Sequence, residues 1–198
     1  MTKSGDALGA IASYYKNTSE VVGLLENMFA AVFPESYPKY KVAFEAGRWL
    51  GQDPGPWLGR AIVYKLDGAL HTDRKDFGPA ACVPCGHFTG GQMLVPQFKG
   101  KFTWVGFLAY SKNKFANLLW RYKAGHVCLF ESRDVWHKVA PFRPTPMDPN
   151  RKDGLTPGRI STVFFFPEAS YDLLKDKEKG WAEKTNMGRW RSMEELIP

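Results

Sequence analysis

The sequence lacks long hydrophobic runs, and cysteine is scarce. No apolar run approaches the roughly 18–20 residues that a membrane-spanning helix requires. The first residues, 1–6, show no basic stretch followed by an apolar one, so we expect no secretory signal. We expect a cytoplasmic protein, with a nuclear location left open. Three cysteines in 198 residues are too few for a small, secreted, disulfide-rich scaffold.

Two of the cysteines, Cys82 and Cys85, form a Cys-x-x-Cys pair, and His87 follows them. A zinc site or a redox pair would use this spacing. However, no second ligand pair follows at zinc spacing, and the segment reads as an apolar strand. We therefore expect reduced, buried cysteines.

The composition is that of a packed globular protein with an excess of positive charge. Hydrophobic residues make up 44% and aromatic residues 15% of the chain, and we expect one domain over residues 1–198. The formal net charge is +7. A solvated basic face is the ordinary interpretation, and attraction of an anionic substrate, including nucleic acid, is the alternative. The excess is concentrated in residues 101–150, largely in Lys112, Lys114, Arg121 and Lys123.

Helices are expected at both ends of the chain. Residues 1–57 read as a helical N-terminal support, in which 17–20 form an N-cap run. One apolar stripe is expected to follow it, made by Val21, Leu24, Leu25, Met28 and Phe29. A second short helix is expected over 37–47. The C-terminal segment, 168–198, is expected to form helices over about 168–179 and 192–196.

Short strands are expected over the central segment, residues 58–167. Short strands separated by turn signals indicate a β-sandwich or jelly roll. Two longer connecting segments interrupt them. Residues 103–120 are aromatic-rich and form either a lid or an extra strand and helix of the core, whereas 141–157 form a Pro-rich surface loop. We expect one or both to be mobile without substrate. The expected strands are 60–66, 80–88, 92–96, 127–131, 135–140 and 160–166.

The most informative residues are His71 and Asp73, followed much later by His137 and Arg159. Two residues apart on an extended segment, His71 and Asp73 project from the same face and can share a metal. With His137 from another strand they form the two-His, one-carboxylate set that holds non-haem Fe(II) and leaves coordination positions open. Arg159 supplies a bidentate grip for a carboxylate. His87 and His126 are the rival ligands and are interpreted as structural histidines.

This pattern, H-x-D…H…R-x-S over about residues 58–167, resembles the Fe(II)- and 2-oxoglutarate-dependent dioxygenases. The segment 88–96 resembles the family's F-x-G-G-x-L-x-x-P hairpin, and 124–130 its P-G-D-V-x-x-F strand. Ala124 and His126 stand where Pro and Asp are usual, and the gap from His137 to Arg159 is longer than is common. Among branches, the chain is similar to small single-domain fungal-type oxygenases related to the J-binding-protein and ten-eleven-translocation oxygenase domains.

The resemblance implies a fold, cofactors and an activity. The fold is a double-stranded β-helix, a cupin-like jelly roll, with flanking helices. The cofactors are Fe(II) held by His71, Asp73 and His137, the co-substrate 2-oxoglutarate, and O2. The resemblance also implies that Arg159 and Ser161 bind the distal carboxylate of 2-oxoglutarate. Tyr64 either contacts the co-substrate or is a half-buried strand residue.

The implied activity is that of an oxidoreductase that most often hydroxylates an unactivated C–H bond, with release of succinate and CO2. The leading hypothesis for its substrate is a small molecule such as an amino acid or natural product. The alternatives are a nucleic-acid base oxygenase and a jelly-roll protein that binds metal without catalysis. The substrate, the type of oxidation and the oligomeric state are not indicated by the sequence.

Overall fold

The computed structural model describes residues 4–48, 50–51, 53–64, 68–96, 102–104, 107–109, 118–120, 123–146 and 157–184. The chain divides into two compact units. Unit 1 consists of residues 1–59 and 166–198, and unit 2 consists of residues 60–165.

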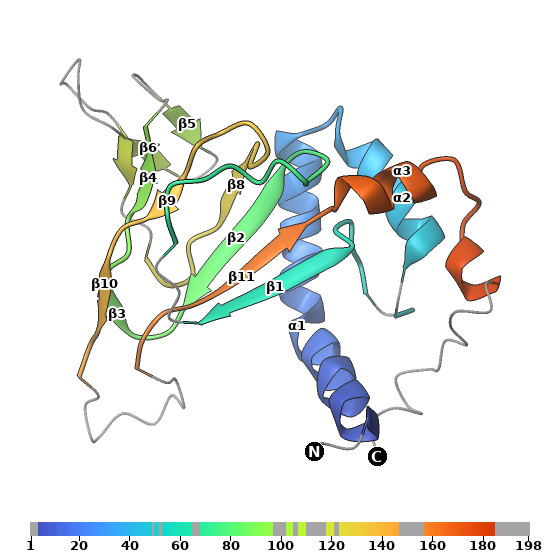
Figure 1. Ribbon diagram of the computed structural model, residues 1–198, viewed down its shortest axis with the longest axis horizontal. Coiled ribbons are helices and arrows are strands. Elements are labelled where there is room, and N and C mark those ends of the chain that lie inside the picture. The colour runs from blue at the N-terminus through green and yellow to red at the C-terminus, as the bar shows by residue number, and fades with distance from the viewer. Residues whose placement is uncertain are drawn as a thin grey trace. The chain divides into compact units, whose positions relative to one another are not determined.

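Unit 1 is built from helices (Figure 1), and it contains a cluster of aromatic side chains. Phe29 is fully buried. Its ring centre lies 5.0 Å from that of Tyr40 and 4.9 Å from that of Trp57. Burying each large apolar side chain contributes about 1.5–3 kcal/mol, so this cluster is a main source of the unit's stability. The helices are α1 (Ser4–Val32), α2 (Tyr37–Gly47), α3 (Glu168–Leu174) and the 3-10 helix η1 (Trp181–Lys184).

Helix α1 corrects two predictions. It begins at Ser4, so the expected N-cap run lies inside the helix. There the Thr18 hydroxyl donates to the Tyr14 carbonyl four residues earlier, a bond that an interior threonine can make without ending a helix. The expected apolar stripe is also displaced. Val22 is buried, whereas Val21 is 49% exposed, because the partners of the helix decide which neighbouring residues face the core.

Leu24 is 59% exposed as well, but Leu25 and Phe29 of the same stripe are buried as predicted. The predicted second helix, 37–47, is confirmed. The predicted C-terminal helix is shorter than expected and ends at Leu174. The helix predicted over 192–196 lies outside the described residues.

Unit 2 contains antiparallel sheets. A four-stranded sheet has the order β1-β11-β2-β8, and a three-stranded sheet has the order β7-β4-β9. Two further pairs are β10-β3 and β5-β6. The strands are β1 (Gly59–Tyr64), β2 (Ala80–Cys85), β3 (Phe88–Gly90), β4 (Met93–Val95), β5 (Phe102–Trp104), β6 (Phe107–Ala109), β7 (Leu118–Trp120), β8 (Cys128–Phe130), β9 (Lys138–Val139), β10 (Phe142–Pro144) and β11 (Ile160–Phe165).

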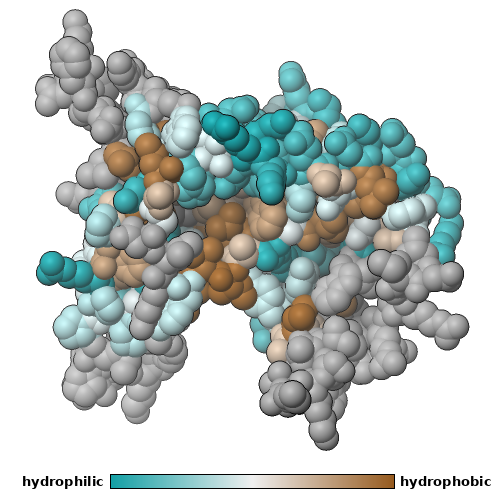
Figure 2. Space-filling view, viewed as in Figure 1, coloured by the Kyte–Doolittle hydropathy of each residue, from teal (hydrophilic) through white to brown (hydrophobic). Residues whose placement is uncertain are grey.

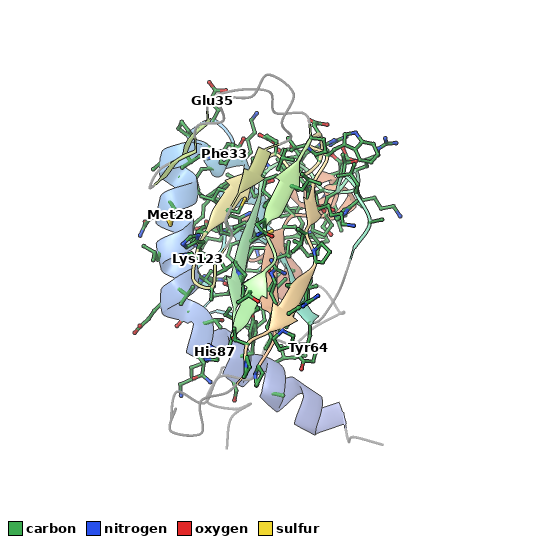
Figure 3. The ribbon with its side chains drawn as sticks, turned by 90° about the vertical axis from the view of Figure 1, so that its left-hand side faces the viewer. Met28, Phe33, Glu35, Tyr64, His87 and Lys123 are labelled. Atoms are coloured by element: carbon green, nitrogen blue, oxygen red, sulfur yellow. The ribbon has the colours of Figure 1, made fainter. Side chains whose placement is uncertain are left out.

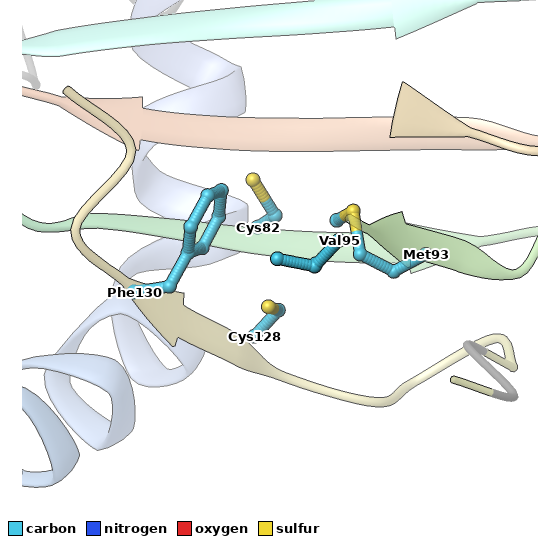
Figure 4. Packing of buried hydrophobic residues seen from close by; sticks show 5 residues of the cluster. All are labelled: Cys82, Met93, Val95, Cys128 and Phe130. Atoms are coloured by element: carbon cyan, nitrogen blue, oxygen red, sulfur yellow. The ribbon is translucent and has the colours of Figure 1, made fainter. Parts of the chain in front are cut away.

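Side chains from the two larger sheets meet in one buried cluster (Figure 4). Cys82 comes from β2, and Cys128 and Phe130 come from β8. Met93 and Val95 come from β4, in the other sheet. All five residues are at most 8% exposed. Because the cluster draws on both sheets, it fixes β4 against β2 and β8.

The predicted strands are confirmed in type, with changes of detail. The strand predicted over 135–140 is reduced to β9, and His137 forms an isolated bridge just before it. The strand predicted over 80–88 is divided into β2 and β3 at Gly86, whose φ is 97°. The segment 141–157, predicted as loop throughout, begins with β10, which pairs with β3. Parts of the segment 103–120 form β5, β6 and β7. Its other residues, and 147–156, lie outside the described residues, so the predicted mobility of both segments stays a prediction.

The fold is therefore a mixture of helices and antiparallel sheets, as the coarse prediction had it. In the part of the chain that the structure describes, no helix is long and apolar enough to cross a membrane.

The turn at Gly90 gives a test of this architecture. Gly90 has a φ of +83°, and a Cβ there would lie 2.5 Å from the Pro141 carbonyl oxygen. Gly125 has a φ of +80°, with nothing within 4 Å of such a Cβ. We expect Gly125→Ala to cost about 1–2 kcal/mol of unfolding free energy from the backbone conformation alone. Gly90→Ala should cost more, because β3 and β10 must also separate.

Urea unfolding of the two variants measures the difference. Gly125→Ala is the matched control, since it carries the same strain of positive φ without the close contact. Equal losses of stability in the two variants would show that the approach of Pro141 to Gly90 does not hold β3 and β10 together.

Candidate metal centre

A single backbone bridge brings two histidines together. His71 and His137 form an isolated antiparallel bridge, in which the His71 N–H donates to the His137 carbonyl at 3.1 Å. The His137 N–H donates back to the His71 carbonyl at 2.8 Å. Directly opposed residues of an antiparallel pair project from the same face. The two imidazole ring centres consequently lie 4.4 Å apart.

Asp73 joins the two histidines from the same segment. It lies two residues after His71, and its N–H donates to the Ser132 carbonyl at 2.9 Å. One carboxylate oxygen lies 3.5 Å from His71 Nε2 and the other lies 3.6 Å from His137 Nε2. One potential ligand atom from each residue lies within 4.8 Å of the others. The three side chains therefore form a cluster that can hold a metal ion.

The hydrogen bonds of both imidazoles suit metal binding. His71 Nδ1 lies 2.8 Å from the Ala69 carbonyl oxygen, and His137 Nδ1 lies 2.8 Å from the Val135 carbonyl oxygen. A carbonyl only accepts, so each Nδ1 carries a proton, and in a neutral imidazole the lone pair is then on Nε2. These lone pairs are on the nitrogens that approach Asp73.

The surroundings of His137 favour its neutral form. Burial lowers the pKa of the imidazole, and a metal ligand has to be neutral. The Phe130 ring meets the imidazole edge-on at 4.8 Å between ring centres, which restricts its rotation. His137 is thus prepared as a ligand by both its charge state and its orientation.

The cluster lies in the wall of a cavity of about 290 Å³. Much of the remaining wall is apolar. On β1 and β11 every second residue lines the cavity, as expected for side chains on one face of a sheet. Figure 2 shows hydrophobic residues gathered over the sheet that contains β1 and β11. The apolar wall includes Ala61, Val63, Met93, Val139, Val163 and Phe165.

Arg159 and Ser161 line the same cavity, two residues apart at the start of β11. They are 4% and 3% exposed. The Arg159 guanidinium carbon lies 5.8 Å from the centre of the Phe88 ring and 6.0 Å from that of Phe142. A Cβ at Gly91 would lie 3.2 Å from Phe88 Cε2, so the glycine leaves room for the ring beside which the guanidinium lies. The structure thus brings a buried cation and a hydroxyl to the cavity that holds the His-Asp-His cluster.

Tyr64 is placed differently from the other candidate residues. It lies at the end of β1 and is 49% exposed (Figure 3). Ala61 and Val63 of the same strand line the cavity. Alternation along β1 directs Tyr64 away from their face, and Tyr64 does not line the cavity. This arrangement favours the strand-residue interpretation over contact with a co-substrate.

The rival histidines lie outside the cluster. His87 lines a separate polar groove with Lys123, and both are labelled in Figure 3. His126 Nδ1 accepts from the Lys123 backbone N–H at 3.4 Å. Among the described residues, the group able to hold a metal consists of His71, Asp73 and His137.

The cysteines have free thiols, but they are not all buried. Cys82 and Cys128 are buried, whereas Cys85 is exposed, which corrects part of the prediction. Cys82 faces inward from β2 and also lines the cavity. Burial, with a contribution from the Asp73 carboxylate, raises the pKa of the Cys82 thiol to about 12, so it is protonated and inert at neutral pH.

One cavity residue was missed by sequence reasoning. Asp76 is 9% exposed, and its N–H donates to the Asp73 carbonyl at 2.8 Å. The Ser132 hydroxyl donates to its carboxylate at 3.4 Å. Burial, followed by the nearby Asp73 carboxylate, raises the pKa of Asp76 to about 6. The signal in the sequence was only a second aspartate three residues after Asp73, which is too common to single out.

In comparisons with known proteins, no protein-family model and no curated protein matches the chain.

The cluster predicts which histidines matter for metal binding. We expect His71→Ala and His137→Ala to weaken Co2+ or Mn2+ binding by more than about 100-fold, because removal even of groups that only orient a ligand costs 10–100-fold. Isothermal titration calorimetry measures this directly. His126→Ala is the control and should bind as the unchanged protein does. Loss of binding in that variant, or full binding by His137→Ala, would contradict the assignment.

Proposed function

We propose that this chain is an Fe(II)- and 2-oxoglutarate-dependent dioxygenase that oxidises an apolar group of a small molecule. One observation carries the proposal: a two-His, one-carboxylate cluster and a buried Arg-Ser pair line the same cavity. The first is the ligand set of non-haem Fe(II), and the second suits a carboxylate. We further propose a double-stranded β-helix for unit 2, supported by two antiparallel sheets that share one core cluster.

The residues present fit the implied metal. The donor set consists of two imidazole nitrogens and one carboxylate, from two segments that the His71–His137 bridge holds in register. His71, Asp73 and His137 would hold Fe(II) and leave positions open for other ligands. When bound together, iron and 2-oxoglutarate supply the oxidation of a C–H bond by O2, with release of succinate and CO2.

The protein's own contribution is binding and orientation. Arg159, whose guanidinium lies beside the Phe88 and Phe142 rings, would bind the distal carboxylate of 2-oxoglutarate, and Ser161 would donate a second hydrogen bond. Because Arg159 is mostly shielded from water, a carboxylate bound there is held more strongly than it would be at the surface.

The apolar wall indicates which part of the substrate enters. Val63 and Phe165 on the sheet, and Val139 near the cluster, offer neither charge nor hydrogen bonds. With Arg159 engaged by the co-substrate, the cavity is suited to an uncharged hydrocarbon group. These side chains would also keep water away from the oxidised carbon.

The direct test is succinate formation. Purified protein is supplied with Fe(II), ascorbate, O2 and 2-oxoglutarate, together with a panel of apolar amino acids and other small molecules. Succinate is followed by NMR. Formation that requires both iron and a panel compound supports the proposal. Tight metal binding with no succinate for any compound would instead favour a metal-binding protein without catalysis.

The proposed binding of the 2-oxoglutarate carboxylate by Arg159 gives a separate prediction. We expect Arg159→Gln to raise the KM for 2-oxoglutarate by about tenfold or more, because a charged hydrogen bond contributes about 1.5–3 kcal/mol. Arg143→Gln is the matched control, since Arg143 is an exposed arginine on β10 outside the cavity lining. An unchanged KM in the Arg159 variant would move the carboxylate site elsewhere, for example to Arg133 or Lys65. Of these two, Lys65 lies outside the described residues.

A further inference from the structure

A second groove lies on the other face of the two segments that carry the metal-binding side chains. Side chains alternate along extended segments, so Thr72 projects away from the face shared by His71 and Asp73. Trp136 does the same relative to His137. The groove has a volume of about 440 Å³ and shares no lining residue with the cavity. It is lined by Thr72, Arg74, Arg133, Asp134 and Trp136.

The bridge between the two histidines also organises this groove. Its antiparallel register places Thr72 opposite Trp136. Arg74 Nε donates to the Thr72 hydroxyl at 3.3 Å, and the Arg74 guanidinium carbon lies 5.9 Å from the centre of the Trp136 ring. Trp136 is 39% exposed, so part of the indole is open to a ligand.

The groove combines an aromatic surface with positive charge. Arg133 donates through Nη1 to the Asp76 carbonyl at 3.5 Å, which orients its side chain. Asp134 contributes one carboxylate, so two positive charges face one negative charge along the lining. An indole stacks with planar rings, and guanidinium groups bind carboxylate and phosphate through paired hydrogen bonds.

We propose that this groove is a binding site for an aromatic anion, a planar ring that carries one carboxylate or phosphate group. The ring stacks on Trp136, and the anionic group lies against Arg74 and Arg133. The occupant contacts the outer side of both metal-binding segments and does not enter the cavity. The site goes beyond the proposed oxidation and does not depend on it.

The experiment is calorimetric titration of the metal-free protein. Benzoate and phenyl phosphate are the probes, and they distinguish a carboxylate from a phosphate as the source of the charge. Benzyl alcohol keeps a ring without charge, while acetate and inorganic phosphate keep the charge without a ring. We expect at least one aromatic anion to bind saturably and about tenfold more tightly than benzyl alcohol, acetate or inorganic phosphate. The reason is that the ring and the anionic group both contribute to binding.

Two pairs of variants locate the binding. Arg74→Gln should weaken it about tenfold, the loss expected for a charged hydrogen bond. Lys75→Gln is the matched control, because Lys75 is the adjacent exposed cation but does not line the groove, and it should change binding less than twofold. Trp136→Leu should abolish saturation. If the leucine variant does not fold, Trp136→Phe is used in its place. This variant retains a stacking ring and should retain saturable binding.

The outcomes are distinct. The proposal is overturned if neither aromatic anion binds saturably, or if a partial compound binds as tightly as the whole. It is also overturned if Lys75→Gln weakens binding as much as Arg74→Gln, which would show a diffuse attraction of anions to a basic surface. Thermal unfolding of each variant establishes that a loss of binding is not a loss of fold.

Discussion

The pair of backbone hydrogen bonds between His71 and His137 is the interaction on which the candidate site depends. It fixes the register of two segments that are 66 positions apart in the sequence numbering. Because side chains alternate, this register determines which residues share each face. Asp73 joins the histidines on one face, and Thr72 lies opposite Trp136 on the other. A slip of one residue would exchange the faces and separate the three potential ligands.

The charges around the cavity are best understood as parts of a site completed by ligands. A buried cation is costly unless its surroundings compensate it, and Arg159 is only 4% exposed. The faces of Phe88 and Phe142 offset part of that cost through their interaction with the guanidinium. A bound carboxylate would offset more. Likewise, a metal ion between the Asp73 carboxylate and the two imidazole rings would compensate the charge of that carboxylate. Both features are consistent with the proposed binding of a metal ion and a carboxylate.

Local patterns in the sequence predicted much of this arrangement, since alternation along a strand needs no knowledge of the fold. His71 with Asp73, and Arg159 with Ser161, are such pairs, and the structure brings both pairs to one cavity. Predictions that depended on distant partners succeeded less often. In α1, Val22 is buried and Val21 is not, and Cys85 of β2 is exposed, because packing between elements decides such details.

The burial of Asp76 is another detail that local sequence patterns did not predict. Its burial follows from a turn that returns its N–H to the Asp73 carbonyl and from Ser132, a residue far along the chain. Ser132 also accepts the Asp73 N–H through its carbonyl. One residue of the loop before His137 therefore binds the Asp73 backbone and the Asp76 carboxylate, which ties the two segments together beyond the histidine bridge. Since these segments form a wall of the cavity and of the outer groove, any effect of a groove ligand on metal affinity must be matched by an equal effect of the metal on that ligand.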